Sequence, residues 1–249
     1  MLSKNKIKLI QSLRTKKYRQ KYNKFTVEGH KSSVEFLNSL IYPIEMVIAL
    51  PEWVEENSRM VAQKNYPVHI VPASIMKVLT QFKTPSPIML VCQMKEEDLN
   101  FLEKAHSLIF LDNVQDPGNV GTIIRIADWF GLDGVLLSTG SVDLFNPKLI
   151  AASMGSFINV NMCTNAETLI TNDLLEFEFV AADMVGVDYK KFTFSKKTVL
   201  CFGNEGHGFS KAVESRINHW INIPGAPQRV AESLNVAIAT SIICANWKL

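Results

Sequence analysis

The chain reads Ala231-Glu232-Ser233-Leu234-Asn235-Val236-Ala237-Ile238-Ala239 close to its C-terminus. Two polar residues flank Leu234, and an unbroken apolar pattern with helical spacing follows. Ser233 is a natural N-cap, so the stretch predicts a helix start whose first amides are free to meet a polar or anionic ligand. On its own the stretch fits many enzymes, and two upstream segments decide between them.

The first upstream segment reads Asp116-Pro117-Gly118-Asn119-Val120-Gly121-Thr122-Ile123-Ile124-Arg125 and follows an apolar strand pattern. Asn119 is predicted to cap a helix that reaches about Phe130. Gly121 and Arg125 are four residues apart and therefore share one face of that helix. A glycine there lets a ligand or another backbone approach closely, with a permanent cation beside it. A surface salt bridge of Arg125 is the alternative.

The second upstream segment reads Gly203-Asn204-Glu205-Gly206-His207-Gly208 and also follows an apolar run. Its three glycines allow a tight backbone, and Glu205 is its one carboxylate. The lysine of a phosphate-binding loop and the Gly-x-Gly-x-x-Gly order of a dinucleotide site are both missing. Together the three segments predict a nucleotide-type cofactor pocket made of backbone loops and helix N-termini.

Composition indicates a protein with an ample core. The chain has 249 residues, of which 47% are hydrophobic and 20% charged. No apolar run approaches the ~18 residues of a membrane span, and the basic N-terminus lacks a signal-peptide core, so we expect a cytoplasmic protein without a membrane contact. The cysteines lack zinc-ligand spacing, and no metal is expected. They are Cys92, Cys163, Cys201 and Cys244.

The pattern of elements predicts two domains. Residues 1–95 alternate between helical and strand patterns, beginning with a basic helix over 3–20, and form a small α/β domain. Residues 96–106 are charged and weakly patterned, as in a linker. Residues 107–249 contain apolar runs separated by helical segments, which predicts a largely parallel sheet covered on both faces.

The predicted C-terminal helix has two apolar stripes. One consists of Leu234, Ile238 and Ile242, and the other of Val236, Ile243 and Trp247. A helix that is apolar on more than one face is buried on more than one face. A partner subunit would cover the second stripe, and deep burial within one domain is the alternative.

Positive charge is concentrated at the N-terminal end. Residues 1–31 hold ten of the 26 basic residues and one of the 24 acidic residues, Glu28. This basic head, residues 1–31, on an otherwise acidic chain indicates a polyanionic partner. Tyr18 and Tyr22 within it are suited to stack on bases. A solvated basic helix without a partner is the alternative.

The three segments resemble, in order, motifs 1, 2 and 3 of the SpoU (TrmH-type) RNA 2′-O-ribose methyltransferases of the SPOUT superfamily. The matching positions are Asn119-x-Gly121-x-x-x-Arg125, Gly203-x-Glu205-Gly206-x-Gly208, and Ile223-Pro224 with Ser233-Leu234-Asn235. Asn146-Pro147-Lys148 with Ala152-Ser153-Met154-Gly155 resembles the intervening helix of the family. The resemblance covers about 107–249, and residues 10–35 are similar to the substrate-binding domain that often precedes it.

The resemblance implies a knotted α/β methyltransferase domain that binds S-adenosylmethionine and forms homodimers through this domain. It places the cofactor on the backbones of Gly203, Ile223 and Leu234, with Thr139 and Gly140 as further candidates. It gives Arg125 the catalytic part, while Asn119 and Asn235 orient groups and Glu205 fixes Arg125 or the loop. Gly225 and a longer loop stand where many members have methionine and a shorter loop, which changes the loop path.

The implied function is methyl transfer to a ribose 2′-hydroxyl of ribosomal RNA, with transfer RNA as the alternative substrate. Lys16, Lys17 and Arg19 of the basic head are the predicted phosphate contacts. A non-catalytic RNA-binding or ribosome-assembly relative is an alternative, against which Asn119, Arg125, Glu205 and Asn235 argue. An unrelated nucleotide-binding oxidoreductase is a second alternative, against which the missing glycine motif argues.

Overall fold

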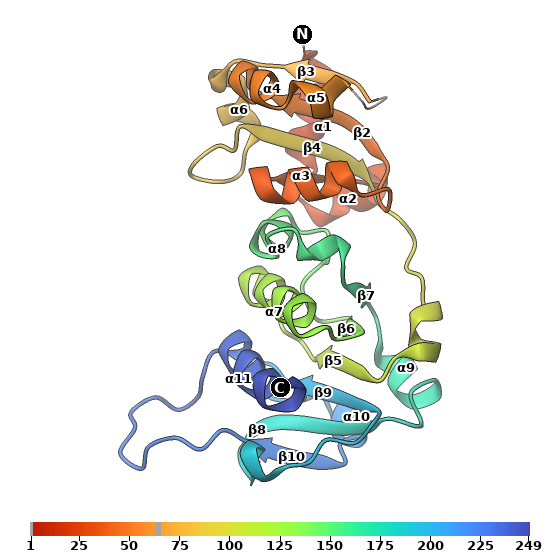
Figure 1. Cartoon of the computed structure of the whole chain (residues 1–249), viewed down its shortest axis with the longest axis vertical. Helices are drawn as coiled ribbons and strands as arrows, with labels where there is room; N and C mark the ends of the chain where they lie inside the picture. Colours follow the sequence, from red (N-terminus) through yellow and green to blue (C-terminus); the bar gives the residue numbers. More distant parts are fainter. Residues whose placement is uncertain (1, 63–65) are drawn as a thin grey trace. The chain divides into compact units, whose positions relative to one another are not determined.

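Two β-sheets organise the computed structural model, which describes residues 2–62 and 66–249 (Figure 1). The first compact unit takes the chain up to Glu96 together with Asp143–Ile158. The second unit comprises Glu97–Val142 and Asn159–Leu249. The segment 143–158 therefore leaves the second unit, packs with the first, and returns.

The first unit is built on a four-stranded sheet with the order β1-β4-β2-β3, in which β4 is antiparallel to its neighbours. Its strands are β1 (Lys24–Glu28), β2 (Ile44–Ala49), β3 (Val68–Ile70) and β4 (Ile88–Gln93). Its helices are α1 (Lys4–Ser12), α2 (Lys16–Tyr22), α3 (His30–Asn38), α4 (Pro51–Glu56), α5 (Ser58–Ala62), α6 (Ala73–Leu79) and α8 (Pro147–Ala152), with the 3-10 turn η2 (Ser156–Ile158). Pro51 begins α4 as the sequence predicts.

The predicted continuous helix over 3–20 is wrong, because α1 and α2 are separated at residues 13–15. Leu13 is fully buried, and the Arg14 guanidinium donates to the carbonyls of Val78, Leu79 and Thr80 at 2.8–3.0 Å. These carbonyls lie at the end of α6, where a helix leaves acceptors without an internal partner. The tertiary contact therefore interrupts a sequence of good helix formers.

Aromatic packing ties the segment 143–158 to the first unit. Phe145 lies 4.8 Å from Phe25 of β1, and Phe157 lies 5.9 Å from Phe36 of α3, measured between ring centroids. Phe25, Phe36 and Phe157 are almost completely buried. Because aromatic side chains bury large apolar areas, this cluster is a core in its own right.

The second unit contains a six-stranded sheet with the order β10-β8-β9-β5-β6-β7, and every neighbouring pair is parallel. Its strands are β5 (Ser107–Leu111), β6 (Gly134–Leu137), β7 (Asn161–Cys163), β8 (Glu178–Asp188), β9 (Thr198–Phe202) and β10 (His219–Asn222). Its helices are α7 (Pro117–Phe130), α9 (Glu167–Asn172), α10 (Lys211–Glu214) and α11 (Val236–Lys248), with the 3-10 turns η1 (Asn100–Lys104) and η3 (Tyr189–Lys191). The predicted parallel sheet is confirmed.

Both faces of this sheet are buried, as near-continuous apolar strands require. Leu108 and Phe110 of β5 pack with residues of α9 and α10. Ile109 and Leu111 are equally buried and point to the opposite face, since side chains alternate along a strand. There α7 and α11 pack side by side (Figure 1).

A bulge in β8 shapes the edge of the sheet where the candidate site lies. The register with β10 shifts between Trp220 and Ile221, so that Val187 rather than the next residue opposes Ile221. Gly186 has φ +151°, and a Cβ there would lie 2.5 Å from the Trp220 carbonyl. The bulge therefore depends on glycine, and bulges commonly re-aim side chains beside functional sites.

No helix within the described residues is long and apolar enough to cross a membrane.

Candidate active site

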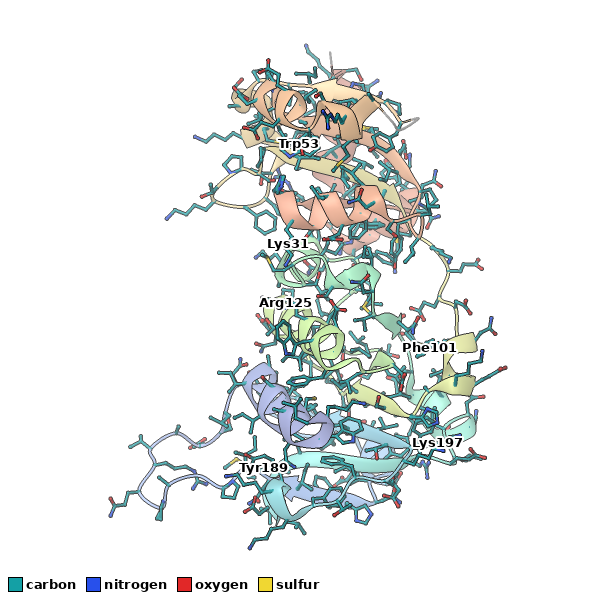
Figure 2. All side chains as sticks on the ribbon, viewed as in Figure 1. Lys31, Trp53, Phe101, Arg125, Tyr189 and Lys197 are labelled. Atoms are coloured by element: carbon teal, nitrogen blue, oxygen red, sulfur yellow. The ribbon has the colours of Figure 1, made fainter. Side chains whose placement is uncertain are left out.

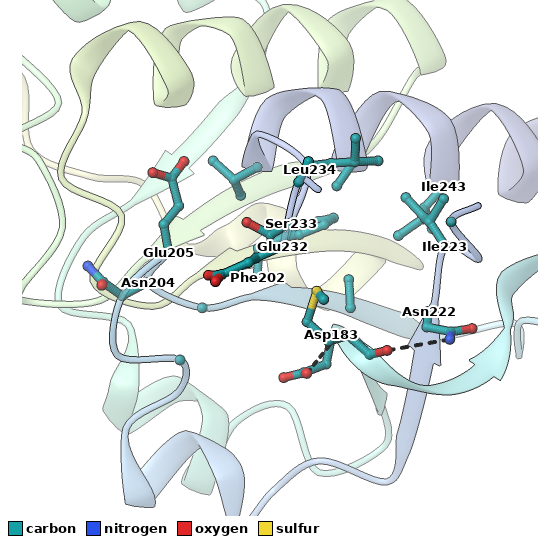
Figure 3. Close-up of a pocket in the computed structure, with 18 of the residues that line it drawn as sticks. Asp183, Phe202, Asn204, Glu205, Asn222, Ile223, Glu232, Ser233, Leu234 and Ile243 are labelled. Atoms are coloured by element: carbon teal, nitrogen blue, oxygen red, sulfur yellow. Dashed lines mark hydrogen bonds between the residues drawn. The ribbon is translucent and has the colours of Figure 1, made fainter. Parts of the chain in front are cut away.

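The second unit holds a cavity of about 690 Å³ at the carboxyl ends of β8, β9 and β10 (Figure 3). It is bounded by the β8 bulge, the glycine loop after β9, the loop after β10 and the start of α11. Its lining includes Asp183, Gly203, Glu205, Asn222, Ile223, Glu232, Leu234 and Ile243. Ligands of open α/β sheets bind at this edge, so the position is that of a cofactor site.

The glycine loop is held closed by its own backbone. Asn204 and Gly208 exchange two backbone hydrogen bonds at 2.9 Å, and Asn204 Oδ1 accepts from the amides of Gly206 and His207. A Cβ on Gly203 would lie 2.7 Å from the Gly208 carbonyl carbon. Only glycine permits this approach, which leaves the loop backbone to form one wall of the cavity.

The start of α7 differs from the sequence prediction. Asp116 is the N-cap, and its carboxylate accepts from the Asn119 amide at 2.8 Å. The prediction that Asn119 caps the helix is wrong, because Pro117 takes the first helical position and fixes the cap one residue before it. The Asn119 side chain is thereby free for contacts outside its helix.

Asn119 connects the glycine loop to the start of α11. Its Nδ2 donates to Glu205 Oε1 at 3.1 Å, and its Oδ1 accepts from Asn235 Nδ2 at 2.8 Å. The structure thus brings together three of the four predicted catalytic residues, one from each of three distant segments. Glu205 is also part of the cavity lining, where Figure 3 shows it on the glycine loop.

Asn235, rather than the predicted Ser233, caps α11. Its Oδ1 accepts from the amides of Ala237 at 3.0 Å and Ile238 at 3.3 Å. The preceding residues 224–235 are exposed and run away from the sheet before returning to it (Figure 1). This path leaves Ser233 on the cavity wall without a capping role.

Arg125 lies on an exposed part of α7 (Figure 2) and is not among the residues that line the cavity. Within the described part of the chain, its guanidinium has no hydrogen-bond or ion-pair partner. Glu205 therefore contacts Asn119 and not Arg125. This exposed, unpaired cation remains available to an external anion.

Of the predicted cofactor contacts, Gly203, Ile223 and Leu234 line the cavity. Thr139 and Gly140 do not belong to the described lining. The Thr139 amide and hydroxyl donate to Glu167 at 2.6 and 3.1 Å, and a Cβ on Gly140 would overlap the side chain of Asn113. The structure therefore separates these two residues from the other three.

The sequence reasoning did not single out Asp183, Asn222 or Glu232, which line the same cavity. Asp183 and Asn222 come at the ends of buried apolar runs, and Asn222 Nδ2 contacts the Met184 carbonyl at 3.5 Å (Figure 3). A polar residue at the end of a buried apolar run is a signal that could have located Asp183 and Asn222.

Cysteine chemistry is not part of this site. All four cysteines are free and buried. Burial raises the pKa of the Cys244 thiol to about 12, so it stays protonated and acts as a packing residue. Among the described residues, no group of three or more His, Cys, Asp or Glu side chains is placed to hold a metal ion.

The predicted RNA-binding residues of α2 divide into two groups. Lys16 and Lys17 are exposed. Arg19 is only 3% exposed and forms an ion pair with Asp143, with its Nε donating at 2.9 Å. Its Nη1 donates to the carbonyls of Leu13 and Arg14 at 2.9 and 3.0 Å. Arg19 thus differs from the expected exposed cation, because Asp143 and two carbonyls use its donors.

A parallel α/β unit with a glycine loop and a cavity at the carboxyl edge of its strands has the architecture of an enzyme with a nucleotide-type cofactor. The chain belongs to the SpoU rRNA methylase family, whose profile matches residues 106–245. The MRM3-like substrate binding domain matches residues 4–90.

Individual relatives cover nearly the whole chain. It is 33% identical to the 23S rRNA (guanosine(2553)-2′-O)-methyltransferase RlmP of Bacillus subtilis, over 96% of this chain and 94% of the relative. A TrmH-family structure from Porphyromonas gingivalis is 36% identical, with a TM-score of 0.84 over 100% of this chain and 98% of the other. The AdoMet-bound rRNA methyltransferase from Sinorhizobium meliloti is 29% identical, with a TM-score of 0.83 over 99% and 95%.

Proposed function

We propose that the protein transfers a methyl group from S-adenosylmethionine to a ribose 2′-hydroxyl of ribosomal RNA. The observation that carries the proposal is the Glu205–Asn119–Asn235 hydrogen-bond network beside the cavity. It joins the three segments that resemble the family motifs. Membership of the SpoU rRNA methylase family and the extensive match to RlmP support the same reaction.

The cavity suits S-adenosylmethionine in its chemistry. Ile223, Leu234 and Ile243 offer apolar contact for a flat adenine ring, and the glycine loop offers backbone groups at close approach. Asp183, Glu205 and Glu232 supply carboxylates on the same cavity, which complement the positive charge of a sulfonium and an amino group. We assign the cofactor to Gly203, Ile223 and Leu234, with Thr139 and Gly140 as outer candidates.

When bound, the cofactor supplies an electrophilic methyl group on a positively charged sulfur. The residues of this chain then have to align the ribose and assist its hydroxyl. A guanidinium donates hydrogen bonds and accepts none, so Arg125 serves better as a phosphate contact and electrostatic stabiliser of the developing alkoxide than as a base. Asn119 and Asn235 hold Glu205 and the glycine loop in position.

RNA binding is assigned to the first unit, with Lys16 and Lys17 as phosphate contacts on exposed positions of α2. Tyr18 and Tyr22 of the same helix stack on each other with centroids 6.1 Å apart. We assign Arg19 to the architecture of this surface, since its ion pair with Asp143 anchors α2. Ribosomal RNA in the cytoplasm is the proposed substrate, with transfer RNA as the alternative.

We further propose that two copies associate through the second unit. Ile238 on α11 is 53% exposed and Leu234 is 46% exposed, whereas Val236 and Ile243 of the same helix region are buried. One predicted stripe is thus covered within the protomer, and Trp247 on that stripe stacks on Phe194 with centroids 5.0 Å apart. The other stripe has the apolar surface that a homodimer would bury.

Two measurements test the proposed function. Calorimetric titration with S-adenosylmethionine should show binding, and titration with a nicotinamide cofactor should not. Mapping of 2′-O-methyl groups in RNA from cells with and without the protein should then reveal one missing methylation. Cofactor binding without any missing methylation would favour the non-catalytic RNA-binding relative, and nicotinamide binding would favour an oxidoreductase.

A further inference from the structure

A buried carboxylate holds both ends of the glycine loop. Asp112 directly follows β5 and is 1% exposed. Its backbone amide donates to the Phe202 carbonyl at 2.8 Å, and its carboxylate Oδ2 accepts from the Ser210 amide at 2.6 Å. Phe202 and Ser210 stand on either side of the loop 203–208. One residue therefore fixes both the point where this loop leaves β9 and the point where it returns.

The next residue gives the loop a third attachment. The Asn113 carbonyl accepts from Asn204 Nδ2 at 2.8 Å. Asn113 has φ +56°, a left-handed conformation that asparagine adopts more readily than most residues, and its side-chain amide donates to Asp112 Oδ1 at 3.0 Å. A Cβ on Gly140 would overlap the Asn113 side chain, so glycine at this position leaves room for it. Asp112 and Asn113 together thus hold the loop at three points.

The charge of Asp112 is buried without a counter-charge. Among residues 2–62 and 66–249, no cation forms an ion pair with its carboxylate, which accepts from the Ser210 amide and the Asn113 side chain. Burial of an unpaired charge costs free energy. A neutral asparagine would avoid this cost, but its NH₂ group would face one of the two donors. The carboxylate is therefore explained by the two acceptor oxygens that it offers.

We propose that Asp112 is a positioning residue for methyl transfer, an inference that rests on the proposed function. Through Ser210 it sets the path of the glycine loop, which carries two groups of the site. Gly203 lines the cavity as a proposed cofactor contact, and Glu205 accepts from Asn119 at the start of α7. Asp112 is not among the described residues that line the cavity, so it acts on the cofactor through the loop.

Release of the loop should affect the cofactor and not the RNA. The other walls of the cavity carry Ile223 and Leu234, and the loop that Asp112 holds faces them (Figure 3). A loop with a free end would spend less time in the conformation that encloses the cofactor, and the apparent affinity falls with that fraction. RNA binding is assigned to Lys16 and Lys17 of the first unit, so its affinity should stay the same.

The test compares two variants of the full chain. Asp112→Ala removes both acceptor oxygens, and Asp112→Asn keeps the shape and one acceptor but loses the charge. We expect Asp112→Ala to weaken S-adenosylmethionine binding about tenfold by calorimetry, the equivalent of one hydrogen bond to a charged group. Asp112→Asn should lose less affinity. In both variants the KM for the cofactor should rise, while RNA affinity, measured by fluorescence anisotropy, stays at the wild-type value.

Asp133→Ala is the matched control, because Asp133 holds the opposite end of β5. Its Oδ2 accepts from the His106 amide at 2.9 Å and from the Ser107 amide and hydroxyl at 2.8 and 2.9 Å. Urea unfolding should show a loss of stability in both alanine variants, whereas cofactor affinity should fall only in the Asp112 variants. If Asp112→Ala does not fold, the isosteric Asp112→Asn provides the measurement.

Unchanged cofactor affinity in every folded Asp112 variant would overturn the proposal. An equal loss of affinity in Asp133→Ala would also overturn it, since the effect would then follow stability alone. The wild type separates this inference from the proposed function. A wild type that does not bind S-adenosylmethionine refutes the proposed function, whereas a wild type that binds it and transfers methyl groups no better than the Asp112 variants refutes only the positioning role.

Discussion

The side-chain amide of Asn235 donates a hydrogen bond to Oδ1 of Asn119 at 2.8 Å, across 116 residues of chain. The same Asn235 side chain caps α11 through its oxygen. One residue thus has two tasks, each using a different atom of its amide. The two tasks can be separated by substitution.

Asn235→Ala removes both contacts, and Asn235→Asp removes only the donor toward Asn119. We expect Asn235→Ala to lower the free energy of unfolding by about 1 kcal/mol through loss of the cap, while Asn235→Asp keeps most of that stability. Both should lower the rate of methyl transfer by about fivefold, the equivalent of one hydrogen bond. Denaturant unfolding and single-turnover assays measure the two effects. Full activity in Asn235→Asp would mean that the bond to Asn119 has no functional role.

Arg125→Ala should abolish most of the methyl transfer while leaving cofactor affinity unchanged. The side chain is exposed and lies outside the cavity lining, so its loss should affect neither the fold nor the cofactor contacts. Loss of one electrostatic stabiliser of the transition state typically lowers the rate by about 10²–10³-fold. Arg125→Lys retains the charge without the planar fork and should be intermediate. Calorimetry with cofactor and transfer assays with RNA measure the two quantities, and near-normal turnover of Arg125→Ala would contradict the role.

Ile238→Glu should dissociate the proposed homodimer. The side chain is 53% exposed in the protomer, so the charge costs little there, but it would be buried without a partner in an apolar interface. Leu175→Glu is a matched control, since Leu175 is 66% exposed in the same unit. Sedimentation velocity gives the oligomeric state. If Ile238→Glu and Leu175→Glu both sediment with the same mass as the wild type, this face of α11 is excluded from a dimer contact.

Neutralising Lys16 and Lys17 together should weaken RNA binding and reduce its salt dependence. Each phosphate contact contributes about 0.7–0.9 to the slope of log affinity against log salt concentration, so the pair should lower the slope by roughly 1.5. Lys190 and Lys191, adjacent and exposed on η3, provide a control with the same loss of charge. An equal loss in both double variants would indicate a general charge effect instead of a contact by α2.

Arg19→Ala should behave differently from the lysine variants. Removing one partner of a buried ion pair leaves the other charged group unpaired, and the free energy of unfolding should fall by about 3 kcal/mol. Thermal or denaturant unfolding measures this loss. A stable Arg19→Ala protein with weakened RNA binding would instead place Arg19 among the phosphate contacts.

Local pattern was sufficient for several elements of the fold. The parallel sheet of the second unit, the proline start of α4 and the end of α7 near Phe130 all follow from apolar periodicity and turn residues. The caps were harder, because Asp, Asn and Ser are similarly good at an N-cap and sequence propensity does not rank them. Pro117 could have identified Asp116 as the N-cap of α7, since proline prefers the first helical position.

Long-range pairing explains the remaining differences. The sequence gives no sign that Arg19 meets Asp143, 124 residues later, or that Asn119 meets Asn235. Charge alone therefore assigned Arg19 to the RNA surface together with Lys16 and Lys17. The break between α1 and α2 has the same origin, because the carbonyls that Arg14 contacts belong to a distant helix.

The buried Glu28 carboxyl should make the stability of the protein depend on pH. Burial raises the pKa of Glu28 above its ordinary value of 4.5, although the Thr80 hydroxyl, the Gln81 amide and the charge of Arg14 oppose the shift. Thr80 Oγ1 donates to Glu28 Oε2 at 2.5 Å. As the pH rises from 4.5 through the raised pKa, the unfolded chain releases this proton first. The contribution of Glu28 to the free energy of unfolding therefore falls across that window and is constant outside it.

Glu28→Gln removes this titration but can still accept from Thr80. The free energy of unfolding of Glu28→Gln minus that of the wild type should therefore increase above pH 4.5, by about 1.4 kcal/mol for each pH unit that the window spans. Above the window the difference should level off. Urea unfolding at a series of pH values measures the difference. Glu55→Gln, at an exposed position of α4, controls for the loss of one negative charge. A difference that is flat or decreases over this window would show that burial does not dominate the environment of Glu28.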